Sequence, residues 1–168
     1  MGLELLPVNN EDIVRLKKDM QEAFQKGAAK EFAGLEEEIL PEKDIDESLS
    51  KKGAVAYKAV ENDQLLGGAI VVIDKTTQHN HLDFLYVKYG IQSKGIGQKL
   101  WREIEKRHPD TKVWETYTPY FEKRNIHFYI NRLGFRAVEF FNPHHKNPNI
   151  PDDMIGADYF FRFEKTMG

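Results

Sequence analysis

A glycine-rich turn over residues 87–100 carries the clearest chemical signal in the sequence. It reads Val-Lys-Tyr-Gly-Ile-Gln-Ser-Lys-Gly-Ile-Gly-Gln-Lys-Leu and joins a hydrophobic predicted strand to an amphipathic predicted helix. A turn of this kind directs unpaired backbone N–H groups toward one point at the positive end of the helix dipole, where phosphate oxygens bind without a metal. Lys94 and Lys99 can add positive charge at the rim. The turn therefore predicts a site for a phosphorylated ligand.

The glycine spacing does not match the common nucleotide-binding motifs. A Walker A loop needs Lys-Ser/Thr directly after its second glycine, but Gly95 is followed by Ile96 and Gly97. A dinucleotide-binding fingerprint needs a third glycine where Leu100 stands, and it follows the first strand of a βαβ unit rather than a hairpin. A plain strand-to-helix connection without a ligand stays open as the alternative.

The same turn fits a different phosphate-binding motif. Gln92-x-x-Gly95-x-Gly97, after a hydrophobic strand end, resembles the acetyl-CoA-binding motif of the GNAT N-acetyltransferase superfamily. The order of the predicted elements resembles that family over residues 3–165, and so does the Leu-Gly-Phe sequence at 133–135 after the last predicted helix. The resemblance implies the fold of that family and transfer of an acetyl group from acetyl-CoA to an amine.

The resemblance also assigns cofactor contacts by position. The backbone of Leu85, Tyr86 and Val87 would pair with the pantetheine arm like an added strand. An N–H group near Tyr86 would polarise the thioester carbonyl. In the family the sheet parts between its fourth and fifth strands and leaves a V-shaped slot for the thioester. The backbone N–H groups expected to hold the CoA pyrophosphate belong to Gln92, Ser93, Lys94, Gly95, Ile96, Gly97 and Gln98.

A tyrosine near the end of the last predicted helix resembles the family's general acid, which protonates the CoA thiolate. Tyr129 lies five residues before Gly134, whereas the family's tyrosine lies four before. Because one residue turns a helical side chain by about 100°, either the chain absorbs the extra residue or Tyr129 points elsewhere and packs with Phe128. Phe128 and Asn125 are also expected to contact the cofactor. Facing solvent is the alternative for Asn125.

The amine acceptor makes a general base the more demanding requirement. A lysine-like amine with a pKa of about 10.4 needs roughly 4–5 kcal/mol to lose its proton at neutral pH, whereas the CoA thiolate needs only about 2 kcal/mol of help. Glu115 and Asp83 are the candidate bases, and structural carboxylates are the alternative for both. His79 and His81 form a His-x-His pair, but no further ligand is placed beside them, so no metal is predicted.

Composition and charge exclude several classes of protein. The 168 residues are 40% hydrophobic and 12% aromatic, which rules out a disordered chain and suits one domain over residues 1–168. A net charge of −3 gives no general attraction to nucleic acid. No apolar run approaches about 20 residues and no signal peptide is recognisable, so no membrane association and a cytoplasmic location are expected. The lack of cysteine excludes disulfides and a cysteine acyl-enzyme.

The predicted elements form an α/β domain with the GNAT acyl-CoA N-acyltransferase fold. We expect a mixed, mostly antiparallel sheet of about seven strands with helices on both faces. In the strand at 79–87, a period of two places Leu82, Phe84 and Tyr86 on one face, and apolar residues on both faces make this strand central. The predicted strands are 3–8, 54–60, 65–73, 79–87, 112–117, 135–141 and 157–164. The predicted helices are 11–26, 31–40, 45–51, 95–108 and 121–132.

The acceptor end of the site is the least specified by the sequence. Residues 36–47 carry a net charge of −6, which suits a cationic amine, although a solvated acidic surface is the alternative. The predicted function is an N-acetyltransferase that works by direct attack of a primary amine on acetyl-CoA, without a covalent enzyme intermediate. A non-catalytic acyl-CoA sensor or assembly module and a nucleotide phosphate-binding protein are the alternatives. A homodimer is one assembly that the sequence allows.

Overall fold

A computed structural model describes residues 2–31, 38–91, 95–150 and 158–168. The helical elements are α1 (Ile13–Glu31), α2 (Glu42–Ser50), α3 (Ile96–Arg107), α4 (Lys123–His127) and the π-helical turn η1 (Phe128–Arg132). The strands are β1 (Glu4–Pro7), β2 (Ala54–Glu61), β3 (Gln64–Val72), β4 (His79–Val87), β5 (Val113–Pro119), β6 (Arg136–Phe141) and β7 (Phe160–Thr166). Most of the predicted helix over 31–40 lies outside these described residues.

The strands form one mixed sheet of the predicted kind. Its order is β1-β2-β3-β4-β5-β7-β6, and every neighbouring pair is antiparallel except β4 and β5, which run parallel. The strand β4 is therefore central, as its apolar residues on both faces indicated. Strand β1 ends at Pro7, which suits its place at the sheet edge because proline cannot donate a ladder hydrogen bond.

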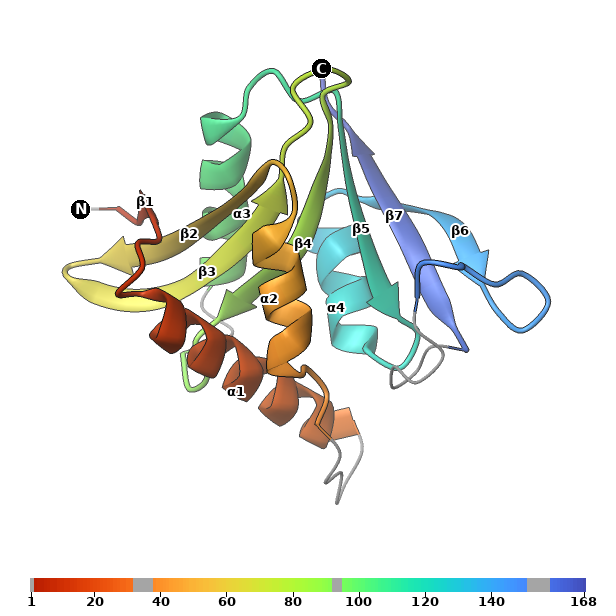
Figure 1. Cartoon of the computed structure of the whole chain (residues 1–168), viewed down its shortest axis with the longest axis horizontal. Coiled ribbons are helices and arrows are strands. Elements are labelled where there is room, and N and C mark those ends of the chain that lie inside the picture. The colour runs from red at the N-terminus through yellow and green to blue at the C-terminus, as the bar shows by residue number, and fades with distance from the viewer. Residues whose placement is uncertain (1, 32–37, 92–94, 151–157) are drawn as a thin grey trace.

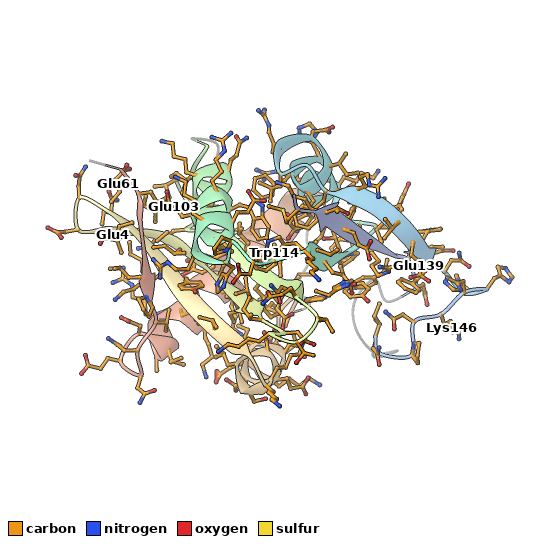
Figure 2. All side chains as sticks on the ribbon, turned by 90° about the horizontal axis from the view of Figure 1, so that it is seen from above. Glu4, Glu61, Glu103, Trp114, Glu139 and Lys146 are labelled. Atoms are coloured by element: carbon orange, nitrogen blue, oxygen red, sulfur yellow. The ribbon has the colours of Figure 1, made fainter. Side chains whose placement is uncertain are left out.

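Helices cover both faces of the sheet, and each layer has its own apolar core. In Figure 1, α1 and α2 lie in front of the sheet and α3 and α4 lie behind it. The front core contains Met20 of α1 and Ile45 of α2, both fully buried. The rear core contains Trp101 of α3, whose ring lies edge-on to Trp114 of β5 at 5.0 Å between centroids. Seen from above, Trp114 lies near the middle of the molecule (Figure 2).

The central sheet parts between β4 and β5. These strands pair only over three residues each, and His81 opposite Glu115 is the last pair. Beyond it the two strands diverge, as Figure 1 shows. The Thr116 hydroxyl donates a hydrogen bond of 2.8 Å to the Leu82 carbonyl oxygen, which satisfies a polar group that the missing ladder would leave unpaired. The V-shaped opening expected between the fourth and fifth strands is therefore present.

A β-bulge in β4 corrects one sequence-based expectation. In the register with β3, Phe84 lies opposite Ile70 but Leu82 lies opposite Val71, so Asp83 is an extra residue on β4. An extra residue reverses which side of the sheet the following side chains face. Leu82 accordingly packs in the rear core, whereas Phe84 and Tyr86 pack against the front core. The simple alternation predicted for these three residues was wrong at the bulge.

The predicted helix over 121–132 contains a wide turn at its end. Residues 123–127 are α-helical, and the next five residues form η1, closed by a hydrogen bond of 3.0 Å from the Leu133 N–H to the Phe128 carbonyl. This i→i+5 bond is the signature of a π turn, which holds one residue more than an α-turn. Gly134 follows with φ of +83°, as expected for a C-terminal glycine. The extra residue between Tyr129 and Gly134 is absorbed by this turn.

Close approach of β3 to β4 predicts a strong effect of substitution at Gly67. A Cβ atom at Gly67 would lie 2.3 Å from the Tyr86 carbonyl oxygen, a backbone atom that cannot move without breaking the strand pair. We expect Gly67→Ala to lower the free energy of unfolding by about 1–3 kcal/mol in urea titrations. The control is Gly27→Ala in α1, where the added Cβ meets nothing within 4 Å. That variant should be about 0.5–1 kcal/mol more stable, and equal loss in both would contradict this account.

Candidate functional site

A cavity of about 740 Å³ lies along the splayed end of β4, between α1, α3 and the α4–η1 segment. It brings together residues predicted from four separate stretches of sequence. The predicted site residues that line it are Leu85, Tyr86, Val87, Gly95, Ile96, Gly97, Gln98, Asn125, Phe128 and Tyr129. The predicted contacts Gln92, Ser93 and Lys94 lie outside the described residues.

The first turn of α3 forms one end of the cavity. Gly95 precedes the helix with φ of +73°, a left-handed conformation that glycine adopts without strain, and nothing lies within 4 Å of where its Cβ would be. The N–H groups of Ile96, Gly97 and Gln98 belong to the first helical turn and so have no carbonyl partner within the helix. The Gln98 side chain donates to the Arg132 carbonyl at 3.2 Å, which fixes α3 against η1. The geometry suits phosphate oxygens.

Side chains of α4 and η1 form another wall of the cavity, and Lys123, Arg124 and Arg132 give it positive charge. Lys123, Arg124, His127 and Arg132 all line the cavity. Cationic side chains beside a helix N-terminus complement an anionic ligand such as a pyrophosphate. The ring of Phe128 fills the space next to Gly97, whose Cβ position lies 2.8 Å from the Phe128 Cζ atom. Only a residue without a side chain leaves this junction between α3 and η1 open.

Tyr129 is both packed and at the cavity wall. It is 7% exposed, and its ring lies within 6 Å of the rings of Phe128, Phe135 and Phe163. Burial, and then the Glu122 carboxylate, raise the pKa of the Tyr129 phenol above its ordinary value, while hydrogen bonds with threonine hydroxyls of β5 oppose the shift. The phenol therefore keeps its proton throughout the neutral range and is available as a donor.

Glu122 is a cavity residue that the sequence reasoning missed. It stands between the end of β5 and the start of α4 and lines the cavity beside Asn125, whose amide donates a hydrogen bond to its carboxylate. Burial raises the pKa of Glu122 to about 7, and the Asn125 hydrogen bond opposes that shift. In the sequence it reads as an ordinary acidic residue at a helix start, so no pattern there marks it.

Asp83, a predicted candidate base, lies outside the cavity lining. Its side chain is 5% exposed and contacts the Ser48 hydroxyl at 2.6 Å, the Lys51 ammonium at 2.9 Å and His81 Nδ1 at 2.6 Å. Burial raises the pKa of Asp83, but the hydrogen bond and charge of His81, followed by the Ser48 and Lys51 hydrogen bonds, hold it at about 2. This carboxylate is thus ionised, and its contacts with Ser48 and Lys51 attach the C-terminal end of α2 to β4.

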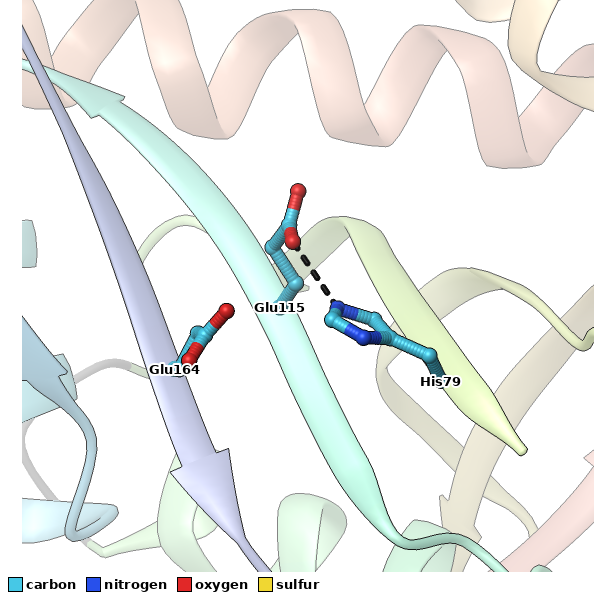
Figure 3. A group of neighbouring side chains, drawn as sticks. All are labelled: His79, Glu115 and Glu164. Atoms are coloured by element: carbon cyan, nitrogen blue, oxygen red, sulfur yellow. Dashed lines mark hydrogen bonds and ion pairs between the residues drawn. The ribbon is translucent and has the colours of Figure 1, made fainter. Parts of the chain in front are cut away.

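Glu115, the other predicted base, lies in the same sheet-face network. Its carboxylate contacts His79 Nε2 at 2.9 Å, His81 Nε2 at 3.8 Å and Arg162 Nη1 at 3.5 Å. Figure 3 shows Glu115 between His79 and Glu164, and ligand-type atoms of these three residues lie within 4.8 Å of one another. Arg162 also pairs with Glu164, so its guanidinium supplies positive charge to both carboxylates of this three-residue cluster.

The environment of Asp83 predicts a stability change in acid. Because its folded-state pKa is below the ordinary 3.8, the ionised carboxylate stabilises the fold above about pH 4, and this contribution is lost as the pH falls toward 2. We expect Asp83→Asn to lower the free energy of unfolding by about 2 kcal/mol at pH 7. The difference should shrink toward pH 2 in urea titrations. Glu47→Gln, at an exposed position of α2, should change little; equal effects would contradict the assignment.

A match to a family model identifies the protein family of this chain. The model of the acetyltransferase (GNAT) family matches residues 14–135, which span α1 through the turn after η1. The chain belongs to the GNAT acetyltransferase family. Among curated proteins, the uncharacterized protein YrkN of Bacillus subtilis is 44% identical over 164 residues, covering 93% of this chain and 89% of that protein. The resemblance predicted from the glycine-rich turn and the element order is thereby confirmed.

Solved structures agree on the GNAT fold. The PaiA N-acetyltransferase of Thermoplasma acidophilum in complex with coenzyme A superposes with a TM-score of 0.70 at 22% identity, covering 99% of this chain and 100% of that one. A GNAT family acetyltransferase from Elizabethkingia anophelis with acetyl-CoA bound gives 0.69 at 14%, with 98% of each chain covered. Acetyl-CoA is the cosubstrate that GNAT membership supports. Among the described helices, none is long and apolar enough to cross a membrane.

Proposed function

We propose that this GNAT domain is an N-acetyltransferase that moves the acetyl group of acetyl-CoA to a primary amine by direct attack. The observation that carries the proposal is the shared cavity, which is lined by the α3 N-terminus, the splayed end of β4 and Tyr129. The pyrophosphate would lie on the N–H groups of residues 95–98, and the pantetheine arm would follow the backbone of residues 85–87. This placement brings the thioester to the point where β4 and β5 part.

Tyr129 is the proposed general acid. Its phenol keeps its proton because burial raises its pKa, so it can donate to the sulfur as the carbon–sulfur bond breaks. The π turn removes the observation that favoured a non-catalytic acyl-CoA sensor, since the unusual spacing before Gly134 no longer implies a misplaced Tyr129. Asn125 lines the same cavity and donates to Glu122, and we place its amide beside the pantetheine arm.

The proposed reaction needs a group that takes the proton of the amine. A carboxylate with a pKa of about 2 is a poor base for an amine, which weighs against Asp83. Glu115 lies at the last residue pair before β4 and β5 part. It remains a candidate base for an amine that enters at this opening. No cysteine is present to carry an acetyl-enzyme, which favours a single direct transfer.

The acceptor is proposed only as a primary amine. A cationic acceptor was suggested by the acidic residues 36–47, of which 36 and 37 lie outside the described residues. Within the described part, Glu42 and Asp46 both pair with Lys17 of α1, at 3.1 and 2.9 Å. Some of the acidic charge therefore connects α2 to α1, and a contribution to acceptor binding rests on the remaining acids.

An assay of thiol release tests the proposed function. Purified protein is mixed with acetyl-CoA and a panel of small amines, amino acids and lysine-containing peptides, and free CoA is measured with a thiol reagent. The enzyme should release CoA only when a suitable amine is present. A parallel thermal-shift series compares acetyl-CoA, CoA and ATP, because a ligand at 100 times its Kd adds about 2.7 kcal/mol of stability. Stabilisation by acetyl-CoA without turnover of any amine would indicate a sensor instead.

A further inference from the structure

We propose that Glu122 is a further catalytic residue, which accepts the proton of the attacking amine inside the cofactor cavity. This inference rests on the proposed N-acetyltransferase function. It differs from the sequence-based expectation, which placed the base on β4 or β5.

The backbone and a neighbouring side chain hold Glu122 in place. Its N–H donates to the Pro119 carbonyl at 3.1 Å, which fixes the residue directly after the end of β5. Its carboxylate accepts a hydrogen bond from the Asn125 amide, one turn further along α4. Both residues line the cavity with Tyr129. The carboxylate is thus positioned on the same wall as the proposed acid.

Glu122 is the one carboxylate in the described lining of the cavity. Its carboxylate accepts a hydrogen bond from Asn125; burial raises the pKa of Glu122, and this hydrogen bond opposes the rise. The described parts of α1 and α3 contribute no titratable side chain to the lining. The other titratable residues that line it are Tyr86 of β4, Lys123, Arg124 and His127 of α4, and Tyr129 and Arg132 of η1.

The two carboxylates predicted from the sequence have a different environment. Asp83 and Glu115 are bound by histidine, lysine or arginine side chains on the sheet face in front of β4 and β5, and neither lines the cavity. For Asp83 these contacts hold the pKa at about 2, which makes its carboxylate a poor base. Burial instead raises the pKa of Glu122 to about 7, which suits proton transfer at neutral pH.

The proposed step balances with the groups in the cavity. The neutral amine attacks the thioester carbon, so a carbon–nitrogen bond forms and the carbon–sulfur bond breaks. The proton lost by the nitrogen goes to the Glu122 carboxylate. The CoA thiolate takes the phenol proton of Tyr129, and Glu122 returns a proton to the tyrosine oxygen. The products are an acetamide and CoA thiol, and both side chains end as they began.

The pH dependence of Glu122→Gln tests the assignment. Glutamine keeps the size of the side chain and an oxygen that accepts from Asn125, but it cannot take a proton. We expect kcat to fall by about 100-fold or more while the Kd of acetyl-CoA, from calorimetry, stays within about twofold of wild type. In the wild-type enzyme kcat/KM should rise with pH through about 7 as the carboxylate forms, and Glu122→Gln should lack this limb.

Three further variants make the result decisive. Glu122→Asp should retain the limb at a lower rate, and Glu103→Gln, at a partly exposed carboxylate of α3, should behave like wild type. The proposal is overturned if Glu122→Gln keeps its limb, if Glu115→Gln loses the limb instead, or if the loss appears only in the KM of acetyl-CoA. If the wild-type protein transfers acetyl to none of the amines, the proposed function is overturned as well. The wild-type assay shows this before any variant is compared, so the two failures are distinguishable.

Discussion

Gly97→Leu should weaken acetyl-CoA binding by at least 100-fold while the protein still folds. A Cβ at this position already lies 2.8 Å from the Phe128 ring, so a longer side chain must displace that ring or enter the cavity beside the first turn of α3. In either case the junction between α3 and η1, where we place the pyrophosphate, is filled. Loss of the complementary N–H contacts to a charged group makes an effect of this size reasonable.

Thermal shift and calorimetry measure this effect directly. Wild-type protein should gain about 2.7 kcal/mol at 100 times the Kd of acetyl-CoA, and Gly97→Leu should gain little at the same concentration. Arg102→Leu, at an exposed position of the same helix, is the matched control and should bind as wild type does. Binding by Gly97→Leu at wild-type affinity, with a cooperative unfolding transition, would show that the pyrophosphate lies elsewhere.

Tyr129→Phe should lower kcat by roughly 30- to 100-fold and leave acetyl-CoA bound. The substitution keeps the ring that packs among Phe128, Phe135 and Phe163 and removes only the hydroxyl. The effect is smaller than expected for the base because protonating a thiolate with a pKa of about 8.5 needs only about 2 kcal/mol at neutral pH.

Leaving-group dependence separates an acid from a packing residue. If Tyr129 protonates the leaving group, an acetyl thioester of a more acidic thiol should lose less rate in Tyr129→Phe than acetyl-CoA does, because its thiolate needs less help. Unfolding in urea provides the control for packing, and the variant should unfold within about 1 kcal/mol of wild type. Equal rates for both proteins with acetyl-CoA would remove Tyr129 as the acid.

The cofactor end of the site could be predicted because it depends on local sequence. Gly95 and Gly97 are required where a strand turns into a helix and backbone approaches a ligand, and the apolar residues at 85–87 mark a buried strand end. Both features depend on residues that are neighbours in the sequence, so they can be recognised without knowledge of the fold. The splay between β4 and β5 was predicted from the family resemblance rather than from any residue pattern.

Other features could not be predicted because they depend on contacts distant in sequence or on irregular backbone. The bulge at Asp83 is visible only in the register with β3, and it reversed the expected side of Leu82. The π turn at Phe128 absorbs the extra residue before Gly134, which a regular helix would have turned into a displaced Tyr129. The raised pKa of Glu122 comes from burial at the cavity wall, and the hydrogen bond from Asn125 opposes it. Neither effect can be read from the residues next to Glu122 in the sequence.

The fate of a labelled acetyl group tests the central proposal most directly. Wild-type protein is incubated with acetyl-CoA carrying ¹³C at the acetyl carbonyl, with and without the best amine of the panel, and the label is followed by NMR. We predict that the thioester signal is replaced by an amide signal only when the amine is present, and that the mass of the protein does not change. A label that stays in the thioester with every amine, or that appears on the protein before transfer, would contradict direct N-acetylation.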